Sequence, residues 1–242
     1  MSDVQKVVAY YDQNAKDLAE RYAAQSPEKL HGRLTAVLDA EKIEGPILEI
    51  GGGVGRDADF FGRRYRSDVT VIEPSEALMQ EMESYLTGRG YAPSNTDMSS
   101  NNGGKSFIVE KDGIEIACVQ YTLDQMAEEV EEDFDPDTII PRYAFINVNA
   151  VWQHQPAAGR PRAATALIHL LEEGGILSVK GRDRPSPEQA GVAWNVTAEE
   201  LAQQFSDLEI IEIEEQPDYS KPGSDLKFIS AVFRKPNGLY AA

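Results

Sequence analysis

The sequence predicts an α/β protein built on a seven-stranded, mostly parallel sheet with helices on both faces. Short β-rich apolar runs alternate with longer segments whose apolar residues recur at helical spacing, which is typical of a parallel sheet covered by helices. The chain has 242 residues, of which 41% are hydrophobic, so it is long enough to bury a large core. We therefore expect residues 1–242 to form a single domain.

Seven short runs rich in β-branched and aliphatic residues are the candidate strands. In chain order they are ILEI (47–50), VTVIE (69–73), IEIACVQ (114–120), YAFINVNAVW (143–152), GILSVKG (175–181), LEIIEIE (208–214) and KFISAVF (227–233). The last two runs are joined by too few residues for a crossover helix. The last strand is therefore predicted to run antiparallel to the others.

Helices are predicted between several of these runs. The segments EALMQEMESYL (76–86) and RPRAATALIHLLEE (160–173) place apolar residues at helical spacing. Thr197 followed by Glu200 forms a capping box, which predicts a helix that runs to about Phe205.

Two stretches interrupt the alternation. Residues 88–104 are rich in Gly, Asn and Ser without periodicity, and they are expected to form a mobile loop. The pair Asp112-Gly113 lies between two β-like runs and predicts a hairpin, so residues 88–113 are interpreted as a loop and hairpin insertion. The acidic run 127–137 is interpreted as a solvated helix face or loop.

The charge balance argues against nucleic acids and membranes as partners. The chain carries 41 acidic and 23 basic residues, a formal net charge of −18, whereas phosphate backbones and anionic lipids normally require a basic surface. No stretch approaches the ~18 continuous apolar residues of a membrane-spanning helix. The amino terminus has no apolar signal-peptide core, so a cytoplasmic protein is expected. Cys118 is the single cysteine and is expected to be a small buried apolar residue, and no metal site is predicted.

Glycines crowd the segment LEIGGGVGRDADFF (48–61), where the first strand is predicted to turn into a helix. At the carboxyl end of such a strand the chain must turn sharply and let a ligand approach its backbone, and glycine tolerates both demands. Gly51, Gly53 and Gly55 read G-x-G-x-G, whereas a dinucleotide fingerprint reads G-x-G-x-x-G. Glu49 precedes this loop, and its charge is unfavourable to a pyrophosphate and favourable to a cation.

The segment from Glu49 to Gly55 resembles the first motif of class I S-adenosylmethionine-dependent methyltransferases of the bacterial small-molecule type. Glu73 ends the second predicted strand 22 residues after Gly51, where that family places the acid that holds two ribose hydroxyls. A carboxylate suits this role because it accepts two hydrogen bonds from a vicinal diol. The segments YAFINVNAVWQHQP and RPRAATALIHLLEEGGILSVKGR resemble the later strands and helix of the family. The resemblance implies a Rossmann-like fold in which residues 1–40 form a helical lid.

The resemblance also implies the cofactor S-adenosylmethionine. The expected cofactor-binding residues are Glu49, Gly51, Gly52, Gly53, Gly55, Arg56, Glu73, Pro74, Gln120 and Asn147. Gln120 stands where the family often has an acid that binds the adenine amino group, and its amide oxygen can still accept a hydrogen bond. Arg56 has two readings, since it could neutralise the cofactor's carboxylate or pair with a neighbouring acid.

The remaining candidates concern the acceptor. His154 follows the fourth main strand, where an open sheet places its ligand crevice, and is the candidate general base, with a structural role as its alternative. Tyr11, Tyr22 and Trp152 are the candidate substrate contacts, and Trp152 is equally a candidate core residue. A base is optional, because the sulfonium already makes the methyl group electrophilic and the protein mainly holds the acceptor in line.

Three functions are therefore compared. The preferred function is methyl transfer from S-adenosylmethionine to a small-molecule acceptor by in-line displacement. The second is an NAD-dependent oxidoreductase on a Rossmann fold, against which the glycine spacing and Glu49 weigh. The third is a methyltransferase-like binding or regulatory module. The acceptor and the oligomeric state are not determined by the sequence.

Overall fold

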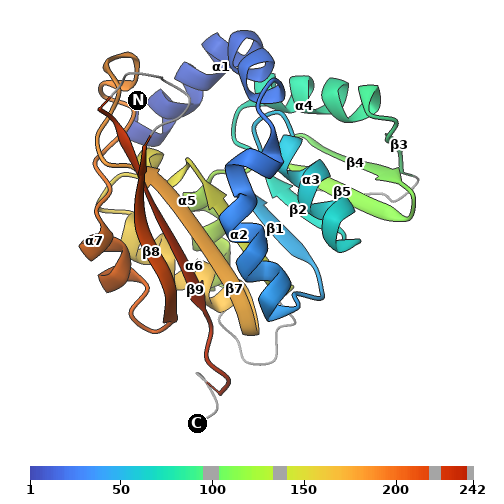
Figure 1. Ribbon diagram of the computed structural model, residues 1–242. Helices are drawn as coiled ribbons and strands as arrows, with labels where there is room; N and C mark the ends of the chain where they lie inside the picture. The colour runs from blue at the N-terminus through green and yellow to red at the C-terminus, as the bar shows by residue number, and fades with distance from the viewer. Residues whose placement is uncertain (95–103, 133–140, 218–224, 239–242) are drawn as a thin grey trace. The chain divides into compact units, whose positions relative to one another are not determined.

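A computed structural model of the chain describes residues 1–94, 104–132, 141–217 and 225–238. The chain divides into two compact units. One comprises Val8–Thr122 and is called here the glycine-loop unit, and the other comprises Met1–Val7 with Leu123–Ala242 and is called the second unit. Figure 1 labels most of the helices and strands.

The glycine-loop unit contains helices on a small mixed sheet. Its elements are the part of α1 (Asp3–Ala23) from Val8 onward, α2 (Pro27–Glu41), β1 (Ile47–Ile50), α3 (Arg56–Tyr65), β2 (Val69–Ile72), α4 (Glu76–Gly88), β3 (Ala92–Pro93), β4 (Ser106–Lys111) and β5 (Ile114–Val119). The strand order is β3-β4-β5-β2-β1. Strand β2 runs parallel to both β1 and β5, while β4 pairs antiparallel with β5 and with β3. The parallel strands therefore end at the same edge, which positions the loops that follow β1, β2 and β5.

The second unit has the same layered construction. Its elements are α5 (Leu123–Glu132), β6 (Tyr143–Asn149), the 3₁₀ turn η1 (Trp152–His154), α6 (Arg160–Leu170), β7 (Leu171–Arg182), η2 (Pro187–Gln189), α7 (Ala198–Gln204), β8 (Glu209–Pro217) and β9 (Lys227–Arg234). The strand order is β6-β7-β9-β8, with β6 parallel to β7 and β9 antiparallel to both of its neighbours. The prediction of an antiparallel last strand is confirmed.

The described residues contain nine strands, two more than predicted. Each of the seven predicted runs overlaps a strand, and the two additional strands, β3 and β4, come from the segment interpreted as an insertion. The predicted hairpin is confirmed, because Asp112 (φ 55°) and Gly113 (φ 76°) turn β4 back into β5. Its second strand is β5 itself, so the hairpin extends the main sheet. Within the predicted loop 88–104, Ala92–Pro93 is a strand, and residues 95–103 lie outside the described residues.

The helix predictions hold with changed boundaries. Helix α6 ends at Leu170, because Leu171 already pairs with Tyr143 at the start of β7. The Thr197 hydroxyl caps α7 by accepting a hydrogen bond from the Glu200 amide at 3.1 Å. The Glu200 carboxylate instead accepts hydrogen bonds from buried Arg160 at 2.7 and 2.8 Å. Of the acidic run 127–137, the described part belongs to α5, and residues 133–137 lie outside the described residues.

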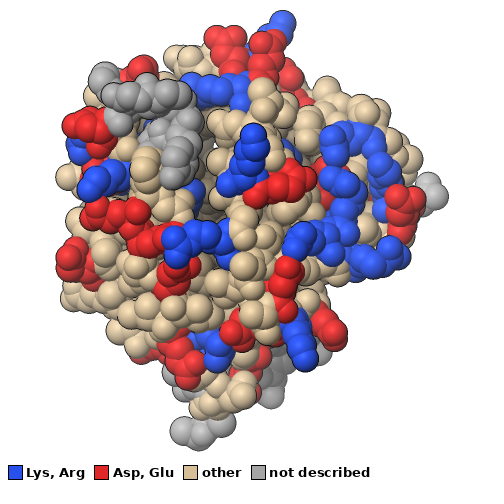
Figure 2. Space-filling model, in the orientation of Figure 1, with Lys and Arg blue, Asp and Glu red and all other residues tan. Residues whose placement is uncertain are grey.

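The surface of the protein carries both signs of charge. Figure 2 shows acidic and basic side chains interspersed over the visible face, with Lys and Arg gathered near the ends of α3 and α4. There Arg63 and Arg89 both bind the buried Asp59 carboxylate, at 2.7 and 2.6 Å, which neutralises part of the cluster. Among the described helices, none combines the length and the hydropathy needed to cross a bilayer. Cys118 is fully buried, as predicted, and burial raises the pKa of its thiol, whose sulfur contacts that of Met82.

Candidate functional site

The glycine loop between β1 and α3 is pressed against strand β2. Gly51, Gly53 and Gly55 have φ of 68°, 56° and 78°, a region that side-chain-bearing residues rarely adopt. Gly52 has no such backbone demand, but a methyl group added there would lie 2.2 Å from Cγ1 of Val71. The glycines thus meet two separate needs, which are the turn itself and close approach to the sheet.

Glu73 follows β2 and is hydrogen-bonded directly to the glycine loop. One carboxylate oxygen accepts the Gly53 amide hydrogen at 2.8 Å, and the other accepts that of Ser75 at 2.9 Å. Only 4% of Glu73 is exposed. Burial raises the pKa of its carboxyl group to about 7, the two amide hydrogen bonds oppose that rise, and the charge of Asp12 adds to it. Each oxygen keeps capacity for a further donor, so the carboxylate is suited to bind a diol.

Arg56 at the start of α3 pairs with a neighbouring acid, which is one of the two roles predicted for it. Its guanidinium forms a two-pronged contact with Asp57 at 2.7 and 2.8 Å, and its Nη1 donates to the Tyr22 carbonyl at 3.0 Å. Asp57 also lies 3.1 Å from Nε2 of His31. Burial alone would raise the pKa of Asp57, but His31 and Arg56 hold it well below its usual range. This buried cluster anchors the helix that follows the loop.

Helix α1 places two tyrosines at the loop. A methyl group added to Gly53 would lie 3.5 Å from the ring of Tyr22. The Tyr11 and Tyr22 side chains are hydrogen-bonded to each other, and both pack against a small apolar cluster of Ala15, Leu18 and Leu78. Burial raises the pKa of Tyr11, and the neighbouring Tyr22 and then the charge of Glu73 add to this rise. The two predicted substrate residues of this unit therefore lie at the glycine loop.

Gln120, expected to bind adenine, follows β5. Its side-chain oxygen accepts the Lys105 amide hydrogen at 3.2 Å, and its Nε2 donates to the Pro74 carbonyl at 3.4 Å. Gln120 thus lies beside Pro74, at the edge where β2 and β5 end. Its contact with adenine stays a prediction.

The second unit contains the three other predicted site residues. Asn147 is fully buried on β6. Trp152 is also fully buried, donates to Gln204 at 3.2 Å and packs on the ring of Phe205 with a centroid distance of 5.4 Å. This environment matches the alternative reading of Trp152 as a core residue. Its contact with substrate and the contact of Asn147 with cofactor stay predictions.

His154 is held at both ring nitrogens. Its Nδ1 lies 2.6 Å from the Val192 carbonyl, so this nitrogen carries the hydrogen, and its Nε2 lies 3.3 Å from Nε2 of Gln153, which donates to it. Burial lowers the pKa of the imidazole to about 4, although the Val192 contact opposes the shift. The ring is therefore neutral at pH 7, and Nε2 is its basic atom.

Two residues at the loop were missed by the sequence analysis. Ser75 caps α4 by accepting the Leu78 amide hydrogen at 3.1 Å, and Asp12 of α1 accepts the Ser75 hydroxyl at 2.6 Å. A serine before EALMQEMESYL is a recognisable capping signal. Asp12 carries no such signal, because its partners lie more than 60 residues away in the chain.

A family model described as "Methyltransferase domain" matches residues 19–215, which is most of the chain. The chain belongs to this methyltransferase family. The prediction of a methyltransferase from the glycine loop and Glu73 is thereby confirmed. A search of curated proteins gave no match for this methyltransferase.

Solved structures share its fold at low sequence identity. Magnesium protoporphyrin IX methyltransferase from Synechocystis PCC 6803, with bound S-adenosylmethionine, superposes with a TM-score of 0.64 at 12% identity over 97% of this chain and 98% of the other. The 1,6-didemethyltoxoflavin-N1-methyltransferase of Burkholderia thailandensis, with its substrate and S-adenosylhomocysteine, gives 0.63 at 15% identity over 96% and 89%. The [4+2]-cyclase SpnF gives 0.63 at 15% identity over 96% of each chain. These similarities show the α/β methyltransferase-like fold, and the cyclase shows that this fold also carries another reaction.

Proposed function

We propose that this methyltransferase transfers the methyl group of S-adenosylmethionine to a small-molecule acceptor. The observation that carries the proposal is the contact of the buried Glu73 carboxylate with the amide of Gly53. This contact joins an acid that can bind a diol to a loop whose glycines leave the backbone open to a ligand. Membership of the methyltransferase family and the cofactors named for two of the similar structures support the same function.

The residues at the loop fit such a cofactor. The two oxygens of Glu73 would accept the ribose hydroxyls while they hold the amides of Gly53 and Ser75. The close fit of Gly52 against Val71 keeps the loop backbone where a ligand can approach it. We assign the cofactor-binding role to Glu49, Gly51, Gly52, Gly53, Gly55, Arg56, Glu73, Pro74, Gln120 and Asn147. When bound, the cofactor supplies an electrophilic methyl group.

The chain itself mainly binds and orients the acceptor. Tyr11, Tyr22 and Trp152 are the proposed substrate contacts, and helices α1 and α2 the proposed lid. His154 is the proposed proton acceptor, through Nε2. With a pKa of about 4 it is a weak base, so it best serves an acceptor whose proton leaves easily during transfer. The net charge of −18 favours a small molecule over a nucleic acid as the acceptor, and we infer a cytoplasmic location.

Ligand titration tests the proposal. Calorimetry with S-adenosylhomocysteine and, separately, with NAD should give binding only to the former. Glu73→Gln keeps the shape of the side chain but loses one charged acceptor, so affinity should fall by about 1.5–3 kcal/mol, the usual contribution of a hydrogen bond to a charged group. Glu83→Gln, an exposed change on α4, is the matched control. NAD binding, or unchanged affinity in a folded Glu73→Gln protein, would contradict the proposal.

Turnover requires an acceptor. Incubation with methyl-labelled cofactor and a metabolite extract, followed by mass analysis, should yield one labelled small molecule. Tight binding of S-adenosylhomocysteine without any labelled product would instead favour a different reaction on this fold, as the cyclase similarity allows.

A further inference from the structure

Helix α1 reaches the Glu73 carboxylate through a short chain of hydrogen bonds. The Asp12 carboxylate accepts the Ser75 hydroxyl at 2.6 Å and the Ala77 amide hydrogen at 3.3 Å. Ser75 in turn donates its amide hydrogen to Glu73 at 2.9 Å. Ser75 thus links Asp12 of α1 to Glu73, the acid that binds the glycine loop.

The partners of Asp12 explain why a carboxylate is favoured there. The first amides of a helix lack partners within the helix, and the amino-terminal end carries a partial positive charge. Ser75 satisfies the amide of Leu78 at 3.1 Å, and Asp12 satisfies that of Ala77 from another helix. Asp12 therefore acts as a second cap of α4, and it fixes the hydroxyl of the first cap.

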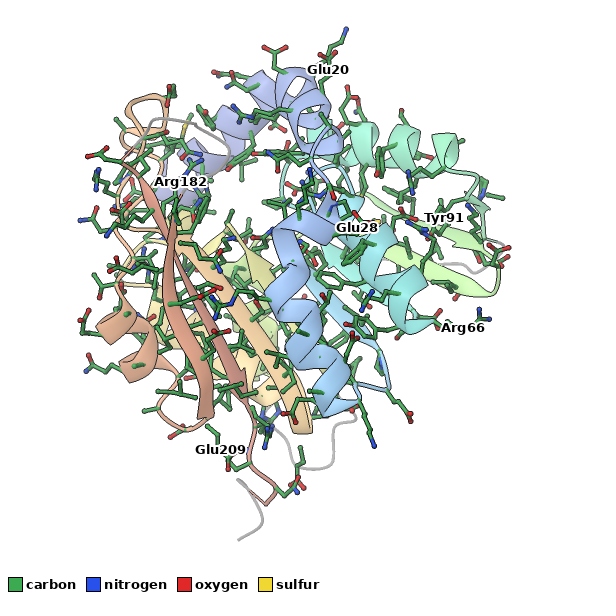
Figure 3. All side chains as sticks on the ribbon, viewed as in Figure 1. Glu20, Glu28, Arg66, Tyr91, Arg182 and Glu209 are labelled. Carbon is green, nitrogen blue, oxygen red and sulfur yellow. The ribbon has the colours of Figure 1, made fainter. Side chains whose placement is uncertain are left out.

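Further contacts hold α1 over the loop. Ala15 and Leu18 of α1 pack against Leu78 of α4. The Tyr22 ring faces Gly53, and the Tyr22 carbonyl accepts a hydrogen bond from Arg56 at 3.0 Å. By contrast, Glu20 on the same helix extends into solvent, as Figure 3 shows.

The two acids oppose each other when Glu73 has no ligand. The charge of Asp12 adds to the burial that raises the pKa of Glu73, so docked α1 and ionised Glu73 repel. A ligand diol that donates two hydrogen bonds to Glu73 stabilises its ionised form, so by charge alone ligand binding would oppose the docking of α1. The favourable coupling is carried by geometry, because docked Asp12 holds Ser75, whose amide keeps the Glu73 carboxylate oriented for two donors, and such coupling is reciprocal.

Resting on the proposed function, we propose that Asp12 is a positioning residue that couples the docking of α1 to cofactor binding at Glu73. It touches neither cofactor nor acceptor in this scheme. It acts through Ser75, by fixing the orientation of the Glu73 carboxylate and by holding α1 against the glycine loop. Loss of Asp12 should then weaken cofactor binding and uncouple α1 from it.

Three variants test this role. Asp12→Ala removes the acceptor, and Asp12→Asn keeps an oxygen for the Ser75 hydroxyl without the charge. Asp17→Ala removes an exposed acid of the same helix and is the control. By calorimetry with S-adenosylhomocysteine, Asp12→Ala should bind about tenfold more weakly, in the range of one lost hydrogen bond to a charged group. Asp17→Ala and Asp12→Asn should stay within about threefold of the wild type.

Hydrogen exchange distinguishes a positioning role of Asp12 from a merely structural one, because it measures how far the ligand protects α1. In the wild type, S-adenosylhomocysteine should slow exchange across residues 8–23, and in Asp12→Ala this slowing should be lost. Equal affinity and equal slowing in both proteins would overturn the inference. So would weaker binding in Asp12→Ala accompanied by faster exchange throughout the unit, which indicates general destabilisation. Failure of the wild type to bind would overturn the proposed function itself, and the wild-type titration separates that outcome from the others.

Discussion

Substitution of Gly52 by alanine isolates the close approach of the glycine loop to the sheet. The added methyl group would lie 2.2 Å from Cγ1 of Val71 and 3.1 Å from Cε of Met82. Met82 has a flexible terminus that can move away. Val71 cannot, because its β-branched side chain is stiff and its strand is paired on both sides, to β1 and to β5. The loop, not the strand, must therefore shift.

The expected cost follows from this contact alone. Gly52 does not have the positive φ of its glycine neighbours, so alanine adds no backbone strain. Overpacking of a well-packed core by a methyl group costs about 1–3 kcal/mol. Movement of the loop would also displace the Gly53 amide from Glu73, so affinity for S-adenosylhomocysteine should fall together with stability.

A double-mutant cycle measures the contact. Val71→Ala removes the clashing methyl group, so Gly52→Ala should cost less in the Val71→Ala background than in the wild type. The coupling free energy between the two substitutions should be about 0.5–3 kcal/mol, with the double mutant more stable than the sum of the two single effects would make it. Urea unfolding of the four proteins supplies the free energies of unfolding, and calorimetry supplies the affinities. Additive effects, or a Gly52→Ala protein as stable as the wild type, would refute the assigned contact.

Three further predictions concern titratable groups. Burial raises the pKa of Glu73 to about 7, so the stability that protonated Glu73 contributes is present below its ordinary pKa of 4.5 and is lost as pH rises through 7. Glu73→Gln should therefore raise the free energy of unfolding of the ligand-free protein at pH 8, measured by urea unfolding. An unchanged or lower free energy of unfolding would contradict the raised pKa. Burial lowers the pKa of His154 to about 4, so its contribution is present above 6.5 and falls as pH drops toward 4. His154→Phe should flatten that dependence, while His154→Ala should lower turnover ~10²–10⁴-fold if the histidine is the base and should change mainly substrate affinity if it is not. Buried Lys235 donates to the carbonyls of Ile168 and Leu171 at 2.8 and 2.7 Å, so Lys235→Met should cost about 1–3 kcal/mol in thermal unfolding, and an unchanged melting temperature would count against this role.

Local patterns predicted the secondary structure well where each element carries its own signal. The Thr197 cap and the Asp112-Gly113 turn form as predicted, because a cap or a tight turn is decided by neighbouring residues. Prediction failed where pairing between distant segments decides the outcome. Ala92–Pro93 became a strand because it meets Val109 and Glu110, and α6 ends early because Leu171 meets Tyr143.

The sequence by itself was enough to predict that this protein is a methyltransferase. Glycines with their backbone freedom, and an acid at the end of the next strand, are properties of residue type and order. The match to the methyltransferase family agrees with the prediction of a methyltransferase.

Only the tertiary structure decided how these residues act on one another. Glu73 gains its raised pKa from burial and from Asp12, and His154 gains its lowered pKa from burial, against the opposing hydrogen bond to Val192. Position 52 requires glycine because Val71 leaves no room for a side chain, and not because of its backbone conformation. Desolvation, charge proximity and steric contact depend on distances between atoms that are remote in the chain, and a linear pattern does not contain those distances.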